Sequence, residues 1–191
     1  MKLGNVFINT KNQDEKILHK IQEQDKKAFI KAYDLYVDEI YRFVYFKIKN
    51  KNDVEDLTST IFLKTWNYII ANTIKDTASL RALFYQIART SIIDYYRKNS
   101  NKENLTINNE KDIPDIKQNI VKDIEVKEEY KVVMEKLKEL KEKYQEIIIW
   151  RFVNELNISE IAKIINKSEG NTRVLVHRAL NALKKICKTK T

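Results

Sequence analysis

The chain has 191 residues, enough for one large domain or two small ones. Two glycines and one proline disfavour a sheet-rich fold, and a single cysteine excludes an intrachain disulfide. The formal net charge of +9 favours an acidic partner, which can be nucleic acid, an anionic membrane surface or an acidic protein. The sequence shows no signal peptide and no apolar run long enough to span a membrane. We therefore expect an all-α protein of the cytoplasm, without membrane insertion.

Helical periodicity organises the first half of the chain. A short helix over residues 14–24 is followed by a long one over residues 28–49, for which Asp25 is a suitable N-cap. Asp53 is expected to cap the next helix. A looser polar stretch then leads to a third long helix over residues 80–98.

The composition changes after the third helix. From Glu103 to Glu125 six acidic residues stand against three lysines, and the only proline lies among them. A solvated segment of this kind is typical of a linker. We therefore expect two small helical domains joined by a flexible acidic linker, with the limits 13–99, 100–125 and 126–191.

Helical periodicity returns in the second domain. Helices are expected over residues 130–140 and 144–154, followed by a short one over residues 158–165. Asn157 stands three residues before Glu160, which is the spacing of a capping box at the start of the short helix.

The end of the chain predicts a helix-turn-helix. The short helix, the polar turn over residues 166–168 and a longer helix over residues 169–186 have suitable lengths for it. Residues 167–191 hold seven Lys or Arg and one acid, so the basic excess is concentrated here. The N-terminal part of such a helix enters the major groove, where Arg, Asn and Thr reach base edges. An ordinary helical hairpin with a solvated basic face is the alternative. The residues expected to pack inward are Ile161, Ile164, Ile165, Val174, Leu175, Leu180 and Leu183.

Two other groups of residues indicate binding. The third helix mixes tyrosines with cations, which suits single-stranded nucleic acid because rings stack on bases and cations follow the backbone. The same tyrosines could instead belong to the core. The helix that begins at Asp53 opens with three acidic residues, Asp53, Glu55 and Asp56. They suit either a docking face or compensation of the helix dipole.

Catalytic patterns are weak. His19 and His177 lie on different helices, and with one cysteine they make no zinc site. A nuclease would need clustered carboxylates or histidines, and no glycine loop for phosphates is present. We expect no enzymatic activity, no metal and no cofactor.

Two segments of the first domain, DVEDLTSTIFLKTW (53–66) and LRALFYQIARTSIIDYYRK (80–98), resemble domain two of extracytoplasmic-function (ECF) sigma factors, in the sigma-70 family of bacterial RNA polymerase. Residues 140–185 resemble domain four of these factors, and residues 14–36 resemble their usual start. The resemblance implies an alternative sigma factor that binds core RNA polymerase and promoter DNA, with an anti-sigma factor as a further partner. A stand-alone helix-turn-helix regulator would account for the last third of the chain only.

The resemblance also implies three sets of binding residues. The set that docks on the clamp coiled coil of the polymerase is Asp53, Glu55, Asp56, Leu57 and Phe62. The set that melts the minus-ten element and holds a flipped base is Asn72, Lys75, Arg81, Arg89, Thr90, Arg97 and Lys98. The set that reads the minus-thirty-five element is Ser168, Glu169, Asn171, Thr172, Arg173, His177 and Arg178.

The sequence departs from the usual pattern of the family at a few positions. Ser59 replaces glutamine in the docking helix, and Leu83 replaces tryptophan as a core exchange. Thr90 replaces asparagine beside Arg89. Val174 and Leu175 replace serine and arginine, which leaves fewer side chains to reach DNA.

Overall fold

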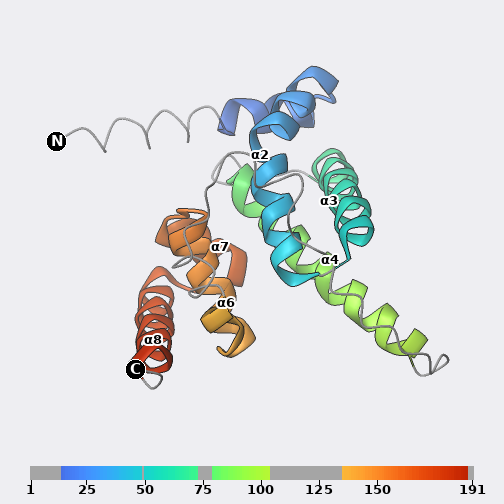
Figure 1. Ribbon diagram of the computed structural model, residues 1–191. Helices are drawn as coiled ribbons and strands as arrows, with labels where there is room; N and C mark the ends of the chain where they lie inside the picture. Colours follow the sequence, from blue (N-terminus) through green and yellow to red (C-terminus); the bar gives the residue numbers. More distant parts are fainter. Residues whose placement is uncertain (1–13, 49, 73–78, 104–134, 189–191) are drawn as a thin grey trace. The chain divides into compact units, whose positions relative to one another are not determined.

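The computed structural model describes residues 14–48, 50–72, 79–103 and 135–188 (Figure 1). All regular secondary structure in these ranges is helical, as predicted. The chain forms two compact units, residues 1–110 and 111–191, and the boundary falls inside the predicted linker. None of the described helices combines the length and apolarity needed to cross a membrane.

The N-terminal unit packs three long helices against one another, and the described residues before them, 14–22, are helical too. They are α2 (Lys26–Lys47), α3 (Lys51–Ala71) and α4 (Leu80–Glu103), drawn in blue, teal and green in Figure 1. The Asp25 side chain accepts hydrogen bonds from the backbone N–H groups of Lys27 and Ala28 at 2.8 and 3.3 Å, which confirms the predicted cap.

The start of α3 differs from the prediction. Asn50 is the N-cap, because its Oδ1 accepts hydrogen bonds from the backbone N–H groups of Asn52 and Asp53 at 2.9 and 3.3 Å. The prediction that Asp53 caps this helix was wrong, and Asp53 lies in the first turn instead. Asn and Asp are both good caps, so the local sequence offered two starting points three residues apart.

Aromatic rings fill much of the core between these helices. Phe62 lies 4.6 Å from Phe84 and 4.8 Å from Tyr33, measured between ring centroids. Leu83 is buried too, which agrees with a core exchange at that position. Beyond Ile92 no residue of α4 with a described side chain is buried, and Figure 1 shows this end of the helix projecting past α2 and α3. The helix reaches Glu103, so residues 100–103 of the predicted linker are helical.

The C-terminal unit is built around a buried tryptophan. The described residues start with the helical residues 135–138, which are followed by α6 (Glu142–Ile148), a π-helical turn η1 (Ile149–Val153), α7 (Ile158–Ile165) and α8 (Glu169–Lys188). Trp150 is fully buried, as is Leu156. The backbone N–H of Asn154 donates to the carbonyl of Ile149 at 2.9 Å, an i to i+5 bond that interrupts the single helix expected over residues 144–154.

The helix-turn-helix is formed as predicted by α7, a three-residue turn and α8. Asn157 and Glu160 make the expected capping box, with N–O distances of 2.9 and 2.8 Å. Asn166 ends α7 in the left-handed conformation, with φ of 52°. Val174 is 49% exposed, so the prediction that it packs inward was wrong: it shares the solvent-facing side of α8 with Arg173 and His177.

Candidate functional site

One face of α3 is exposed along most of its length. Glu55, Asp56, Ser59 and Leu63 recur at helical spacing on it, and Leu63 is 63% exposed. The only ion pair described for the two acids joins Glu55 to Lys51 at 3.8 Å, on the surface. The face therefore starts acidic and continues as a polar strip with two exposed apolar side chains, Leu63 and Ile70, a composition suited to docking on a basic or mixed surface.

Two residues of the predicted docking set make contacts within the N-terminal unit. Phe62 is 3% exposed and belongs to the aromatic core, so its side chain packs behind the exposed face of α3 and is not accessible to a partner. Asp53 accepts a hydrogen bond from the hydroxyl of Tyr95 at 2.5 Å, which ties the start of α3 to α4. Leu57 is half-buried.

The phenol of Tyr95 is perturbed by this arrangement. Partial burial raises its pKa to about 12, and the hydrogen bond and negative charge of Asp53 act in the same direction. The neighbouring hydroxyl of Tyr96 donates to the backbone carbonyl of Lys47, so both tyrosines fasten α4 to other helices. Both hydroxyls therefore have a structural role, whereas the ring of Tyr96 remains 47% exposed at the surface.

The outer side of α4 carries the predicted minus-ten residues that the structure leaves at the surface. Thr90, Arg97 and Lys98 are exposed and Arg89 is half-buried. Arg97 has a surface ion pair with Asp94 at 3.2 Å, and the Thr90 hydroxyl donates to backbone carbonyls of its own helix.

The predicted minus-ten set also includes residues at the end of α3 and beyond. Asn72 is exposed at the end of α3, where its amide donates to the carbonyl of Tyr68 at 2.8 Å. Lys75 lies outside the described residues.

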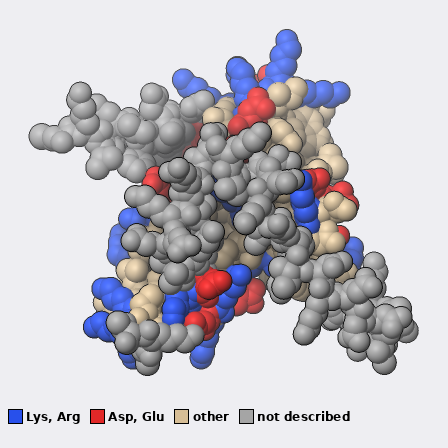
Figure 2. Space-filling view, in the orientation of Figure 1, with Lys and Arg blue, Asp and Glu red and all other residues tan. Residues whose placement is uncertain are grey.

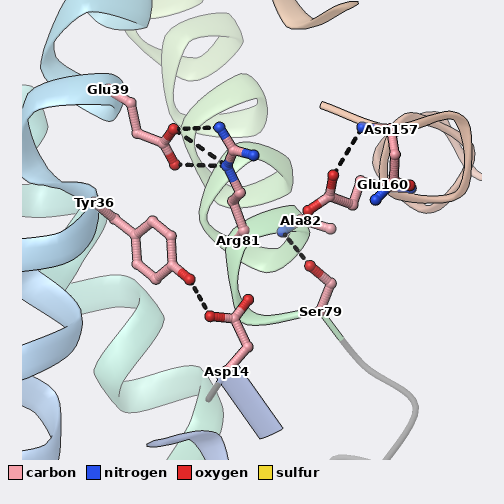
Figure 3. A network of polar contacts seen from close by, with 8 residues as sticks. All are labelled: Asp14, Tyr36, Glu39, Ser79, Arg81, Ala82, Asn157 and Glu160. Atoms are coloured by element: carbon pink, nitrogen blue, oxygen red, sulfur yellow. Dashed lines mark hydrogen bonds and ion pairs between the residues drawn. The ribbon is translucent and has the colours of Figure 1, made fainter. Parts of the chain in front are cut away.

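Arg81 is held inside the N-terminal unit. Its guanidinium donates to both carboxylate oxygens of Glu39 on α2, with Nη2–Oε2 at 2.7 Å and Nε–Oε1 at 3.0 Å. Figure 3 shows this pair next to a hydrogen bond from the Tyr36 hydroxyl to Asp14, which joins α2 to the helical residues 14–22. Burial, followed by the charge of Asp14, raises the pKa of Tyr36. The Arg81–Glu39 pair conflicts with the prediction that Arg81 binds DNA, because the guanidinium group is already used to hold α4 against α2.

The start of α8 exposes several of the predicted minus-thirty-five residues. Glu169, Asn171, Arg173, His177 and Arg178 all lie at the surface. Arg173 forms an exposed ion pair with Glu169 at 2.9 Å, one turn away, and His177 lies 3.3 Å from the amide nitrogen of Asn181.

Two residues of this set stabilise the start of the helix instead. The Ser168 Oγ accepts from the backbone N–H of Asn171 at 3.3 Å, although its side chain is also exposed. Thr172 is fully buried and its hydroxyl donates to the Ser168 carbonyl at 2.9 Å, so it cannot read a base as predicted.

Sequence comparisons match both units to one family. Residues 32–102 match Sigma-70 region 2, and residues 130–183 match Sigma-70, region 4. The chain is 31% identical over 156 residues to the ECF RNA polymerase sigma factor SigM of Bacillus subtilis (strain 168), covering 80% of this chain and 90% of SigM. The chain belongs to the ECF RNA polymerase sigma factors of the sigma-70 family. It is therefore an alternative sigma factor, which binds core RNA polymerase and directs promoter-specific initiation of transcription.

Other relatives agree with this assignment. The ECF sigma factor SigW of the same organism is 26% identical over 188 residues, covering 90% of this chain and 95% of SigW. The fold is similar to that of CnrH, solved in complex with the cytosolic domain of CnrY, with a TM-score of 0.68 and 14% identity over 94% of this chain and 99% of CnrH. It is also similar to the sigma factor RpoE of Bartonella quintana, solved with the anti-sigma factor NepR, with a TM-score of 0.62 and 18% identity over 86% of this chain and 99% of RpoE.

Two exposed apolar residues of this sigma factor were not among its predicted site residues. Leu63 lies on the same face of α3 as Glu55, and Val174 lies between Arg173 and His177 on α8. Extending the helical spacing by two turns from Glu55 would have found Leu63. In the described parts of the chain, no group of three or more His, Cys, Asp or Glu is arranged to hold a metal ion.

Proposed function

We propose that the three functions of the sigma factor are divided among three surfaces. The exposed face of α3, with Glu55, Asp56 and Leu63, binds core polymerase. The outer side of α4 binds the opened minus-ten element, and the start of α8 reads the minus-thirty-five element as duplex. The observation that carries this proposal is that exposed, chemically suited side chains gather on one face of each of these helices.

The minus-ten surface must offset the cost of unstacking bases, which is a few kcal/mol per step. Arg89, Thr90 and Arg97 lie on one side of α4, where two guanidinium groups suit a phosphate backbone and the hydroxyl suits a base edge. Arg81 and Phe62 contribute by holding α4 and α3 in place.

The minus-thirty-five surface has few base readers. Asn171, Arg173, His177 and Arg178 can reach base edges in the major groove, and the exposed methyl groups of Val174 suit a thymine methyl. Polymerase therefore has to supply much of the binding energy that keeps this unit on its promoter.

The proposal includes no catalytic residue in this chain, because the polymerase forms the phosphodiester bonds. It places the protein in the cytoplasm with its polymerase. It also includes an anti-sigma partner, supported by the complex of the Bartonella RpoE with NepR. Co-purification of the full chain with a single small protein that blocks core binding would test this partner.

The docking face is tested by charge reversal. Glu55→Lys/Asp56→Lys should lower the affinity of the full chain for core polymerase by at least about tenfold, since it would set like charges against a basic surface. Glu135→Lys/Glu139→Lys makes the same charge change on exposed residues of the other unit and should leave core affinity near that of wild type. Equal losses in both variants would show a general charge effect and contradict a specific docking face.

The reading surface is tested by Arg173→Ala. If Arg173 contacts a base, the holoenzyme should lose about 1–3 kcal/mol of binding to its preferred promoter and discriminate less at one position. Binding to core polymerase should not change. An unaltered promoter preference would show that Arg173 is not a reader, and a wild-type chain that bound operator DNA but not core would support a stand-alone regulator.

A further inference from the structure

The exposed side of α8 remains basic well beyond its proposed base readers. Arg173, His177, Lys184 and Lys188 stand at positions i, i+4, i+11 and i+15, and all four are exposed. This spacing places them on one face of the helix. Lys185 is exposed next to them, on the same side as Arg178. In Figure 2 Lys and Arg side chains gather over α8, whose place is marked in Figure 1.

The distance along the helix separates these cations into two groups. At 1.5 Å per residue, Lys184 lies about 16 Å from Arg173 along the axis, and Lys188 lies about 22 Å from it. The major groove is only about 12 Å wide. With the N-terminal part of α8 at the base edges and the axis of the helix directed outward across the groove, the two lysines lie at or beyond the wall of the groove, where the phosphates are.

Intrahelical contacts do not account for the two lysines. The sequence offers no acidic residue three or four positions from either of them, and they stand four residues apart, where like charges repel. The helix dipole favours cations in the last turn, but it acts on every face of the helix and does not explain their alignment with Arg173. Lysine is a compact charge that suits phosphate and lacks the fork with which arginine recognises guanine.

We propose that Lys184 and Lys188 form a phosphate-binding extension of α8, which holds the DNA backbone beside the minus-thirty-five element whatever its sequence. This rests on the proposed reading of duplex DNA by α8. The first half of the helix then selects the sequence, and the second half adds affinity that depends on salt but not on sequence.

The test is the salt dependence of DNA binding by the holoenzyme, assembled from the full chain and core polymerase. Two probes are used: a promoter fragment selected by the holoenzyme from a genomic library, and the same duplex with its upstream element scrambled. Lys184→Gln/Lys188→Gln should reduce the slope of log K against log salt by about 1.8 on both probes. Between about 50 and about 200 mM salt, the variant should then lose about tenfold less affinity than wild type.

A matched control separates this site from a general loss of charge. Lys138→Gln/Lys141→Gln removes two exposed lysines from the same unit but from outside α8, and it should leave the slope unchanged. The ratio of affinities for the two probes should stay that of wild type in the α8 variant and fall in Arg173→Ala. Affinity for core polymerase should stay unchanged in both lysine variants.

The outcomes distinguish this inference from the proposed function. If the wild-type holoenzyme does not discriminate between the two probes, the reading role of α8 fails. If it does discriminate but the α8 variant keeps the wild-type slope, only the phosphate-binding extension is overturned. If the variant loses core binding instead, the two lysines face the polymerase and the inference is wrong.

Discussion

Replacing Arg81 by methionine removes one partner of a largely buried ion pair. The Arg81 and Glu39 side chains are 23% and 12% exposed, and their closest N–O distance is 2.7 Å. Two charges about 4 Å apart attract by about 4 kcal/mol at an effective dielectric of about 20. Arg81→Met leaves the Glu39 carboxylate buried without this attraction, so the N-terminal unit should lose about 3 kcal/mol of its free energy of unfolding. Glu39→Met/Arg81→Met should return to within about 1 kcal/mol of wild type, because apolar groups then fill both positions.

Each unit has its own fluorescent probe, since the two tryptophans are Trp66 and Trp150. In a Trp150→Phe background, tryptophan fluorescence recorded during urea unfolding therefore reports on the N-terminal unit alone. Promoter opening by holoenzyme, with Trp150 intact, gives the second measurement. If Arg81 only packs α4 on α2, the double variant regains both stability and opening. A double variant that regains stability but still fails to open the promoter would refute this reasoning. It would show that Arg81 takes part in binding the minus-ten element.

Three further predictions concern stability. Phe62→Ala should lower the free energy of unfolding of the N-terminal unit by about 3–5 kcal/mol. Leu63→Ala should leave the urea midpoint unchanged and weaken binding to core polymerase. Similar urea midpoints for the two variants would contradict the burial of Phe62 and the exposure of Leu63. Tyr95 has a pKa of about 12 against an ordinary 10.0, so the folded unit favours the neutral phenol, and stability present below pH 10 is lost as the pH rises towards 12. Tyr95→Phe should lose less stability than wild type over that window, and equal losses would exclude Tyr95 as the cause. Asn157→Ala should lower the free energy of unfolding of the C-terminal unit by about 1 kcal/mol, measured by Trp150 fluorescence in urea. An unchanged free energy of unfolding would show that the cap does not stabilise this unit.

The sequence predicted the elements whose signals are local. Asp25 at the start of α2 and the Asn157–Glu160 pair at the start of α7 are caps whose partners lie within three residues, and both were confirmed. The helix-turn-helix was found in the same way, from two periodic segments and a short polar turn. Such signals can be read without knowledge of the rest of the fold.

The features that the sequence did not predict depend on contacts between distant residues. Arg81 meets Glu39 across 42 positions, as Tyr95 meets Asp53, and no local pattern pairs them. The π-turn η1 is another case, since it lies where Trp150 enters the core of its unit. Charged and aromatic residues that suited nucleic acid by composition thus proved to be partly structural.

The proposed division of α8 explains how a recognition helix with few readers can still serve a sigma factor. A few base contacts at about 1–3 kcal/mol each discriminate between promoters, but they do not hold a small unit on DNA at physiological salt. Phosphate contacts by Lys184 and Lys188 add affinity equally at every sequence, so they strengthen binding without improving selection. Core polymerase, which we propose to bind α3, raises the effective concentration of this unit at the promoter by tethering. Specific occupancy should therefore require the holoenzyme, while the free chain binds DNA weakly and with little preference.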